Sequence, residues 1–288
     1  MLKKNLALLL SLSFFLFLFS SCSASRVSVN GSKIDNEIYE YFKDKADKEN
    51  SADTLLLRYV AINSKFNEQG LKISSSEKAA LSSDADDIWH LYSAYYTEKG
   101  ISKAAIYKAE LSNLYYTILL ENYYSSDGQS PVAEDDIKDY FKNNYAVIRY
   151  VTGYLFNEDE NGIIEMTDEQ KKSVSKSFTA AAEMINNGSS IEESIASLND
   201  AEIRYAIVTS TDSAGFPDDF FEKIKDLEVG KAAAVTSGSY IFLVLREDGE
   251  KGDYASYTDS RLDCLKAMKS EEFEKIVSSW AKAYTIDN

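Results

Sequence analysis

The chain has 288 residues, of which 44% are hydrophobic and 27% charged, with a formal net charge of −16 at pH 7. This is the composition of a globular protein with one large domain or two ordinary ones. Its acidic surface repels nucleic acid and anionic lipid headgroups, which argues against both as partners. One histidine, His90, and two cysteines, Cys22 and Cys264, leave few side chains for a metal site or for acid–base chemistry.

The N-terminus has the features of an export signal. Lys3 and Lys4 precede an apolar run over residues 6–19, which is too short to span a bilayer comfortably. The residues that end at Cys22 resemble a bacterial lipobox, although Phe19 stands where that pattern prefers leucine. We therefore expect residues 1–21 to be a lipoprotein signal peptide and Cys22 to carry the lipid. The alternative is a plain secretory signal, cut near residues 23–25.

Export defines the expected location and redox chemistry. A lipidated Cys22 would place the protein outside the cytoplasm, tethered to a bacterial cell membrane through lipid alone. Cys264 would then be the only other cysteine, so no internal disulfide is expected.

The segment up to about residue 124 is predicted to be helical after one short strand. Val27 and Val29 alternate with polar residues as in an edge strand, and Asn30-Gly31 is a strong turn signal. Asp35 is a good N-cap for the first helix. Helical patterns then cover residues 51–69, 75–99 and 102–125.

The amino-acid composition changes after a linker over residues 125–131. Three segments rich in Val, Ile and Tyr are predicted to be strands, at residues 146–156, 202–209 and 239–246. Helices are expected around them, at residues 133–143, 167–186, 190–198 and 220–225. A long amphipathic helix over residues 256–283 closes the chain, and its length suggests that it docks on another part of the protein.

This order of parts resembles the PrsA-like and SurA-like extracytoplasmic foldases. The resemblance is carried by Val29-Asn30-Gly31 with Ile34-Asp35, by the segment from Pro131 to Phe141, and by residues 227–231 with the strand after Gly238. It implies an α+β fold: a mainly helical chaperone module formed by both chain ends, with an inserted parvulin-like domain that has a small antiparallel sheet flanked by helices. The implied boundaries are residues 22–130 for the N-terminal helical domain, 131–250 for the parvulin-like domain and 251–288 for the docking helix.

The departures from the family concern its catalytic pocket. Active parvulins carry one histidine at the end of the first strand and a second in the last strand, whereas this chain has Tyr154 and Tyr240 at the matching places. Phe220 matches the aromatic residue that lines the family's proline pocket, and Thr236 matches a further pocket residue. The resemblance thus implies a degenerate proline pocket of Tyr154, Phe220, Thr236 and Tyr240, with no confident catalytic residue.

The resulting hypothesis is a lipid-anchored folding factor that binds unfolded or newly secreted polypeptides without cofactor or metal. The resemblance implies membership of the parvulin family of peptidyl-prolyl isomerases. The isomerase activity is expected to be weak or lost, since a neutral tyrosine does not replace histidine. The abundant tyrosines of the helical segments suit a surface that grips varied chains, or else simply pack the core. The alternative function is a non-catalytic envelope scaffold or accessory lipoprotein with one dedicated partner.

The acidic segment over residues 157–168 has two structural interpretations. Acidic or amide side chains fall at several positions of an EF-hand-like pattern around Gly162, but Asn157 and Asp168 depart from it. The simpler interpretation is a hairpin-like acidic loop that leads into a capping box at Thr167. His90, beside Trp89 in a helix, is interpreted as a structural residue.

Overall fold

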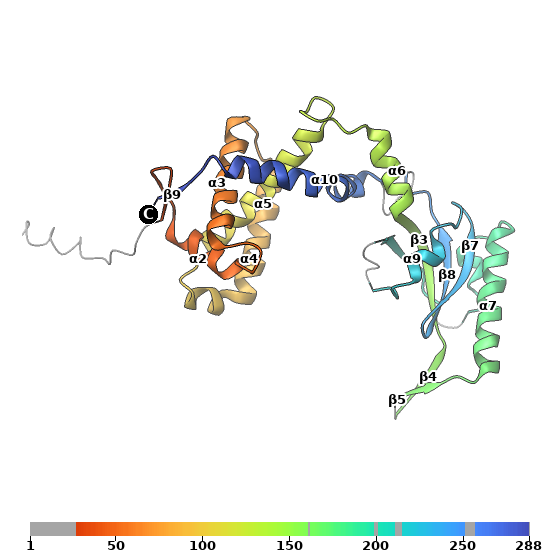
Figure 1. Ribbon diagram of the computed structural model, residues 1–288. Coiled ribbons are helices and arrows are strands. Elements are labelled where there is room, and N and C mark those ends of the chain that lie inside the picture. The colour runs from red at the N-terminus through yellow and green to blue at the C-terminus, as the bar shows by residue number, and fades with distance from the viewer. Residues whose placement is uncertain (1–26, 161, 199–200, 211–214, 251–256, 288) are drawn as a thin grey trace, which may run out of the picture. The chain divides into compact units, whose positions relative to one another are not determined.

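The protein consists of α-helices and small antiparallel sheets, which confirms the α+β prediction. The computed structural model describes residues 27–160, 162–198, 201–210, 215–250 and 257–287 (Figure 1). These residues divide into two compact units, one drawn from Met1–Asn122 and Glu271–Asn288 and the other from Tyr123–Ser270. This division differs from the boundaries expected after residues 130 and 250, because residues 123–130 and 257–270 fall in the second unit.

Cys22 and the predicted signal peptide lie outside the described residues. Among the helices that are described, none is both long and apolar enough to cross a membrane.

The first unit is built from helices whose starts are encoded locally. The side chain of Asp35 accepts a hydrogen bond from the backbone of Glu37, and Ser51 accepts one from Thr54. Ser74 opens the next helix with a complete capping box. The helices are α2 (Asn36–Lys45), α3 (Ala52–Glu68), α4 (Ser75–Glu98), most of α5 (Lys103–Tyr124) and the last turns of α10 (Tyr257–Ala281). The core of this unit includes Val29, Ile38, Leu56, Ile101, Ala105 and Ile106.

A three-stranded sheet joins the two ends of the chain within the first unit. Its order is β2 (Ser32–Lys33), β1 (Ser28–Val29) and β9 (Ile286–Asp287), all antiparallel. The predicted turn is present, with positive φ at Asn30 and Gly31, as a tight hairpin turn requires. The prediction of an edge strand at Val27 and Val29 is wrong, because β9 pairs on the other side of β1. A two-residue strand from the far end of the chain leaves too little pattern to be read from sequence.

The second unit is centred on a four-stranded antiparallel sheet. The strands lie in the order β6 (Arg204–Thr209), β3 (Tyr145–Tyr154), β8 (Tyr240–Arg246) and β7 (Ala232–Ser237). Strand β7 was not predicted, because its Ala-rich sequence has low β-propensity and it becomes a strand by pairing with β8. Helix α6 (Glu134–Asn144) leads into β3.

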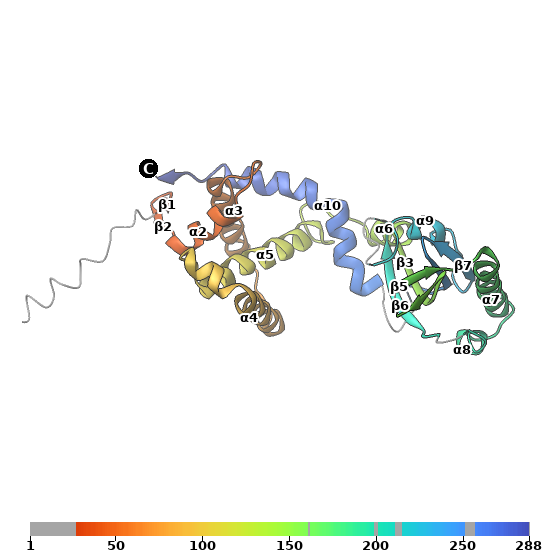
Figure 2. The same cartoon turned by 90° about the horizontal axis from the view of Figure 1, so that it is seen from below.

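Side-chain alternation gives this sheet two different faces. On one face, Ile241 and Leu243 of β8 pack against α7 (Asp168–Asn186), which lies along β7 and β8 in both views (Figure 1, Figure 2). On the other face, Phe242 and Val244 pack against the short helix α9 (Phe220–Ile224). The core is therefore split into two layers, one on each side of the strands.

The acidic segment after β3 is a β-hairpin. Strand β4 (Phe156–Asp159) pairs with β5 (Gly162–Glu165), and Thr167 then starts α7 with a capping box closed by Gln170. In the described part of the chain, no group of three or more His, Cys, Asp or Glu side chains is arranged to hold a metal ion. The structure thus has the hairpin that was the simpler interpretation of this segment.

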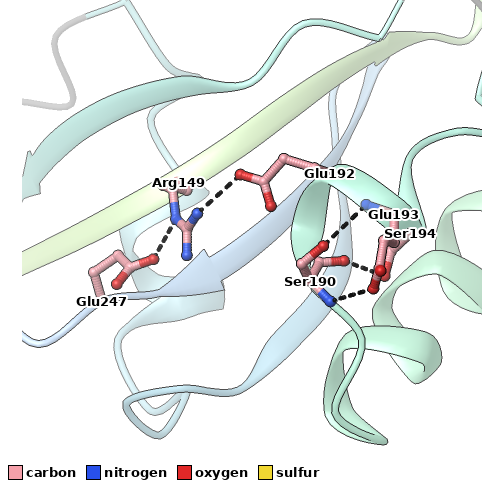
Figure 3. A network of polar contacts seen from close by, with 6 residues as sticks. All are labelled: Arg149, Ser190, Glu192, Glu193, Ser194 and Glu247. Carbon is pink, nitrogen blue, oxygen red and sulfur yellow. Dashed lines mark hydrogen bonds and ion pairs between the residues drawn. The ribbon is translucent and has the colours of Figure 1, made fainter.

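A polar network ties the short helix α8 (Ile191–Ser194) to the sheet (Figure 3). Arg149 of β3 forms ion pairs with Glu247, which follows β8, and with Glu192 of α8, the latter at 3.4 Å. Ser190 and Glu193 cap the helix reciprocally, with hydrogen bonds of 3.1 and 3.2 Å. A partly buried arginine between two carboxylates thus fixes α8 against the sheet.

Candidate functional site

A cavity of about 490 Å³, here named the aromatic hollow, lies on the α9 face of the sheet. Its position follows from strand alternation, because Thr152 and Tyr154 of β3 lie directly opposite Phe242 and Tyr240 of β8 and so share one face. The segment before α9 contributes the opposite wall. The described residues that line it are Tyr150, Thr152, Tyr154, Arg204, Gly215, Phe216, Pro217, Tyr240 and Phe242.

The structure brings together two of the four residues proposed for the degenerate pocket. The rings of Tyr154 and Tyr240 lie with their centroids 5.8 Å apart, and the two residues are 54% and 36% exposed. Phe156 joins them from the hairpin, at 5.2 Å from Tyr154 and 6.1 Å from Tyr240. Tyr154 and Tyr240 therefore form an open rim at one end of the hollow, and Phe156 contacts both rings from outside it.

The other two residues lie elsewhere. Phe220 is fully buried beneath the hollow, stacked on Phe216 at 4.4 Å and edge-on to Phe242 at 4.7 Å. Thr236 is exposed on β7, opposite Ile241, and therefore belongs to the α7 face. Phe220 supports the floor of the hollow, and Thr236 does not border it.

Sequence reasoning missed Tyr150, Phe216 and Phe242 as lining residues. A spacing of two residues relates Tyr150, Thr152 and Tyr154 along β3, and likewise Tyr240 and Phe242 along β8. This period is the sequence signal that would have grouped the lining residues of the two strands, but not Phe216. Phe216 lies in a connection without periodicity, so only the folded chain places it.

The charges around the aromatic hollow are paired. Arg204 donates hydrogen bonds of 3.1 and 2.8 Å to Glu202, whose carboxylate raises the pKa of the guanidinium further. At the start of α9, Lys223 and Ser237 donate to Asp219, and the hydrogen bond from Lys223 is the main reason that the pKa of this carboxyl is lowered. The hydrogen bond from Ser237 ties the start of α9 to β7 of the sheet.

The chemistry of the aromatic hollow is that of binding. No histidine, carboxylate or thiol occurs among its described lining residues, and His90 is an exposed residue of α4 in the first unit. Aromatic faces accept apolar side chains or a proline ring, while tyrosine hydroxyls and Arg204 are able to donate hydrogen bonds to peptide carbonyls. The described lining residues can hold a polypeptide segment, and none of them is a side chain that commonly transfers protons near neutral pH.

A second cavity, the helix-side hollow, lies on the opposite face at the same end of β3. It has a volume of about 480 Å³. Gly153 lets the ring of Phe178 approach the strand, since a Cβ at this glycine would lie 2.4 Å from that ring. Thr152 and Tyr154 border both cavities. The remaining described lining residues are Val151, Phe156, Asn157, Met166, Val174, Ser177, Ser197, Leu198 and Ala201.

The tyrosines of the helical unit are divided between core and surface. Tyr41 and Tyr96 are buried, whereas Tyr92 and Tyr95 are 54% and 47% exposed. Leu91, beside them on α4, is 71% exposed. The end of α4 therefore presents apolar side chains to solvent, in line with one of the two interpretations of the tyrosines.

Comparisons with known proteins give one kind of match. No family model matches the sequence, and no curated protein matches it. The structure is similar to the foldase PrsA of Streptococcus pneumoniae, with 10% identity and a TM-score of 0.43 over 89% of this chain and 92% of that one. PrsA of Lactococcus lactis matches with 12% identity and a TM-score of 0.40, over 90% of each chain.

A third similar structure comes from Campylobacter jejuni. It belongs to a pair described as SurA-like chaperones, PEB4 and the periplasmic protein Cj1289, and has 12% identity, a TM-score of 0.30 and coverage of 91% of this chain and 97% of that one. The predicted resemblance to PrsA-like and SurA-like proteins is thus confirmed as a similarity. At these identities it assigns no activity to this chain.

Proposed function

We propose that this protein is a lipid-anchored extracytoplasmic folding factor that binds unfolded or newly secreted polypeptides. The observation that carries the proposal is the aromatic hollow, where Tyr154 and Tyr240 form an open rim over the buried Phe220 and Phe242. The export signal and Cys22 support the location. The net charge of −16 keeps such a protein soluble and attracts basic client segments.

The proposed architecture is a helical chaperone module made from both chain ends, with a parvulin-like domain between them. The pairing of β1 with β9 supports the contribution of both ends to one module. The order β6-β3-β8-β7, with α7 on one face and α9 on the other, supports the parvulin-like domain.

Isomerase activity is weak or lost in this proposal. An isomerase must bind the twisted X-Pro amide better than the planar one, which calls for polar groups organised under that amide. Here the two histidine positions of active parvulins hold Tyr154 and Tyr240, whose exposed rings contact each other. The aromatic hollow can bind a proline ring without lowering the barrier to rotation.

The test uses the soluble form that begins at Ser23. We expect it to suppress aggregation of several unrelated unfolded proteins, and Tyr154→Ser/Tyr240→Ser to weaken their binding by about tenfold, as for loss of aromatic anchors. Tyr205→Ser is the matched control, because Tyr205 is 43% exposed on β6 but does not line the aromatic hollow. Equal loss in both variants would contradict the assignment of the site.

A proline-limited refolding reaction measures the catalytic part. Uncatalysed X-Pro isomerisation takes tens to hundreds of seconds, and we expect the protein to accelerate it less than about twofold. Strong acceleration that disappears in Tyr154→Ser/Tyr240→Ser would show an active isomerase. Failure to bind any unfolded protein would favour the second candidate, an accessory lipoprotein with one dedicated partner, for which the exposed Leu91 and Tyr92 offer a contact patch.

A further inference from the structure

Strands β3 and β6 separate before β3 ends. They pair from Tyr145 and Thr209 to Tyr150 and Arg204, and residues 201–203, which precede β6, run outside the ladder. On its other side, β3 stays paired with β8 as far as Tyr154. The last four residues of β3 therefore form an edge that has no strand partner on the β6 side within the described part of the chain.

The direction of the free backbone groups on this edge follows from hydrogen-bond alternation. The N–H of Leu155 donates to Ser239, and the carbonyl of Val147 accepts from Glu247, so odd-numbered residues of β3 face β8. Successive residues of a strand point their N–H and C=O groups to opposite sides. The N–H and C=O groups of Thr152 and Tyr154 therefore point into the gap left by β6.

The two hollows lie on either side of this free edge. The aromatic hollow opens on the α9 face and the helix-side hollow on the α7 face, and Thr152 and Tyr154 border both. A strand added at the edge would direct alternate side chains to the two faces. One set of side chains would meet the aromatic rings, and the other set would meet Val174, Phe178 and Leu198.

Negative charges beyond the free edge favour a bound segment that carries a basic side chain. Strand β4 follows β3 along the chain, and its Phe156 lies opposite Glu165 in the hairpin. Glu158 shares this hairpin face with Glu165, and both carboxylates are exposed. A segment that runs along β3 would therefore reach two negative charges next to the aromatic rim, where a basic side chain is favoured.

We propose that an extended polypeptide segment binds by strand addition to the free edge of β3 at Thr152 and Tyr154. Its side chains alternate between the aromatic hollow and the helix-side hollow, and a lysine or arginine follows the apolar stretch and meets Glu158 and Glu165. This binding mode rests on the proposed polypeptide-binding function and specifies how the segment is held: main-chain hydrogen bonds contribute affinity, and the two hollows contribute selectivity.

A protein-side experiment removes one main-chain donor. The probe is the fluorescent, end-capped peptide KKFVYVFKK, whose aromatic and aliphatic residues alternate between lysines. Thr152→Pro deletes the N–H that faces the gap and places the proline ring on the free edge, where proline is tolerated because no ladder bond is lost. Thr152→Ala removes only the side chain, so the difference between the two variants isolates the main-chain contribution.

We expect Thr152→Pro to raise the Kd of the peptide by at least about tenfold relative to Thr152→Ala, from the loss of a hydrogen bond and the block of its neighbours. Circular dichroism and the unfolding temperature check that both variants are folded. Equal Kd values in two folded variants would overturn strand addition, even if unfolded proteins still bind.

A ligand-side experiment uses the unmodified protein and stays decisive if Thr152→Pro does not fold. Two versions of the peptide are N-methylated, one on its aromatic residues and one on its valines. Because only one of these sets faces β3, one version should lose binding at least about tenfold and the other should retain it. Hydrogen exchange at the amides of Thr152 and Tyr154 should slow when the unmodified peptide binds.

The outcomes separate the binding mode from the proposed function. Equal tolerance of both methylated peptides, with unchanged exchange at Thr152 and Tyr154, overturns strand addition and leaves polypeptide binding in place. No binding of the peptide or of any unfolded protein overturns both. A peptide with glutamate in place of lysine should bind several-fold more weakly at low salt, and equal binding would overturn the role of Glu158 and Glu165.

Discussion

Phe216 and Phe220 stack face to face, with ring centroids 4.4 Å apart, yet they have different roles. Phe220 has no exposed surface and packs into the core with Phe242. Phe216 lies above it, lines the aromatic hollow, and is in ring contact with Tyr150 at 5.0 Å. Under the proposed function, we therefore expect Phe220 to serve mainly stability and Phe216 mainly recognition.

Substitution should separate these two roles. Phe220→Ala should lower the free energy of unfolding by about 3–5 kcal/mol, because it leaves a cavity in the core. Phe216→Ala should weaken polypeptide binding by about tenfold, as for loss of an aromatic anchor, with a smaller loss of stability. Denaturant unfolding and peptide titration measure the two effects, and the reverse order of stability losses would contradict the assignment.

At the scale of elements, α6 and α10 are held together by one carboxylate. Glu134, in the first turn of α6, accepts hydrogen bonds from Arg261 at 3.0 Å and from Tyr257 at 2.5 Å. The bond from Arg261 is the main reason that the pKa of Glu134 is lowered, and the bond from Tyr257 adds to it. A negative charge at the start of a helix is also favoured by the helix dipole.

This contact gives stability a defined pH dependence. Because the pKa of Glu134 is lower in the folded state, its contribution is fully present above the unfolded value of about 4.3 and is lost as the pH falls through the folded value. Glu134→Gln should lower the unfolding temperature at pH 7, and its difference from the parent should shrink below about pH 4.

Thermal unfolding at pH 7, 5 and 3.5 tests this expectation. Glu222→Gln is the control in the same unit, because Glu222 of α9 forms an exposed ion pair with Lys225, the residue that follows the helix, and should matter less. A difference between Glu134→Gln and the parent that grows as the pH falls would contradict the sign of the effect.

At the scale of the whole molecule, each unit has its own core. The first core contains Ile38, Leu56 and Ile106, and the second unit has separate layers on the two faces of its sheet. The first unit also depends on the last residues of the chain, because β9 pairs with β1, while Tyr284 and Ile286 pack on its core.

Removal of residues 284–288 should therefore destabilise the first unit alone. Trp89 and Trp280, the two tryptophans of the chain, both belong to that unit, so tryptophan fluorescence reports its unfolding selectively. We expect this transition to move to lower temperature, while a transition of the second unit, followed by calorimetry, stays in place. Equal shifts of both transitions would show that the two units unfold together.

Local signals in the sequence were sufficient for the starts of the helices. Asp35, Ser51, Ser74 and Thr167 cap helices through contacts within three residues, so the helix starts could be predicted from neighbours in the chain. Tyr154 and Tyr240 were grouped through the resemblance to the PrsA-like and SurA-like foldases, and the register of β3 with β8 places them directly opposite each other.

Only the tertiary structure decided the strand partners and the composition of the hollows. Strands β7 and β9 exist through pairing with distant residues, and their own sequences are too weak or too short to indicate it. Phe216 lines the aromatic hollow because a non-periodic connection folds over the sheet, and Thr236 lies on the other face because of its register with Ile241. The separation of β3 from β6 is likewise a matter of register between strands about 50 residues apart along the chain, which no local pattern encodes.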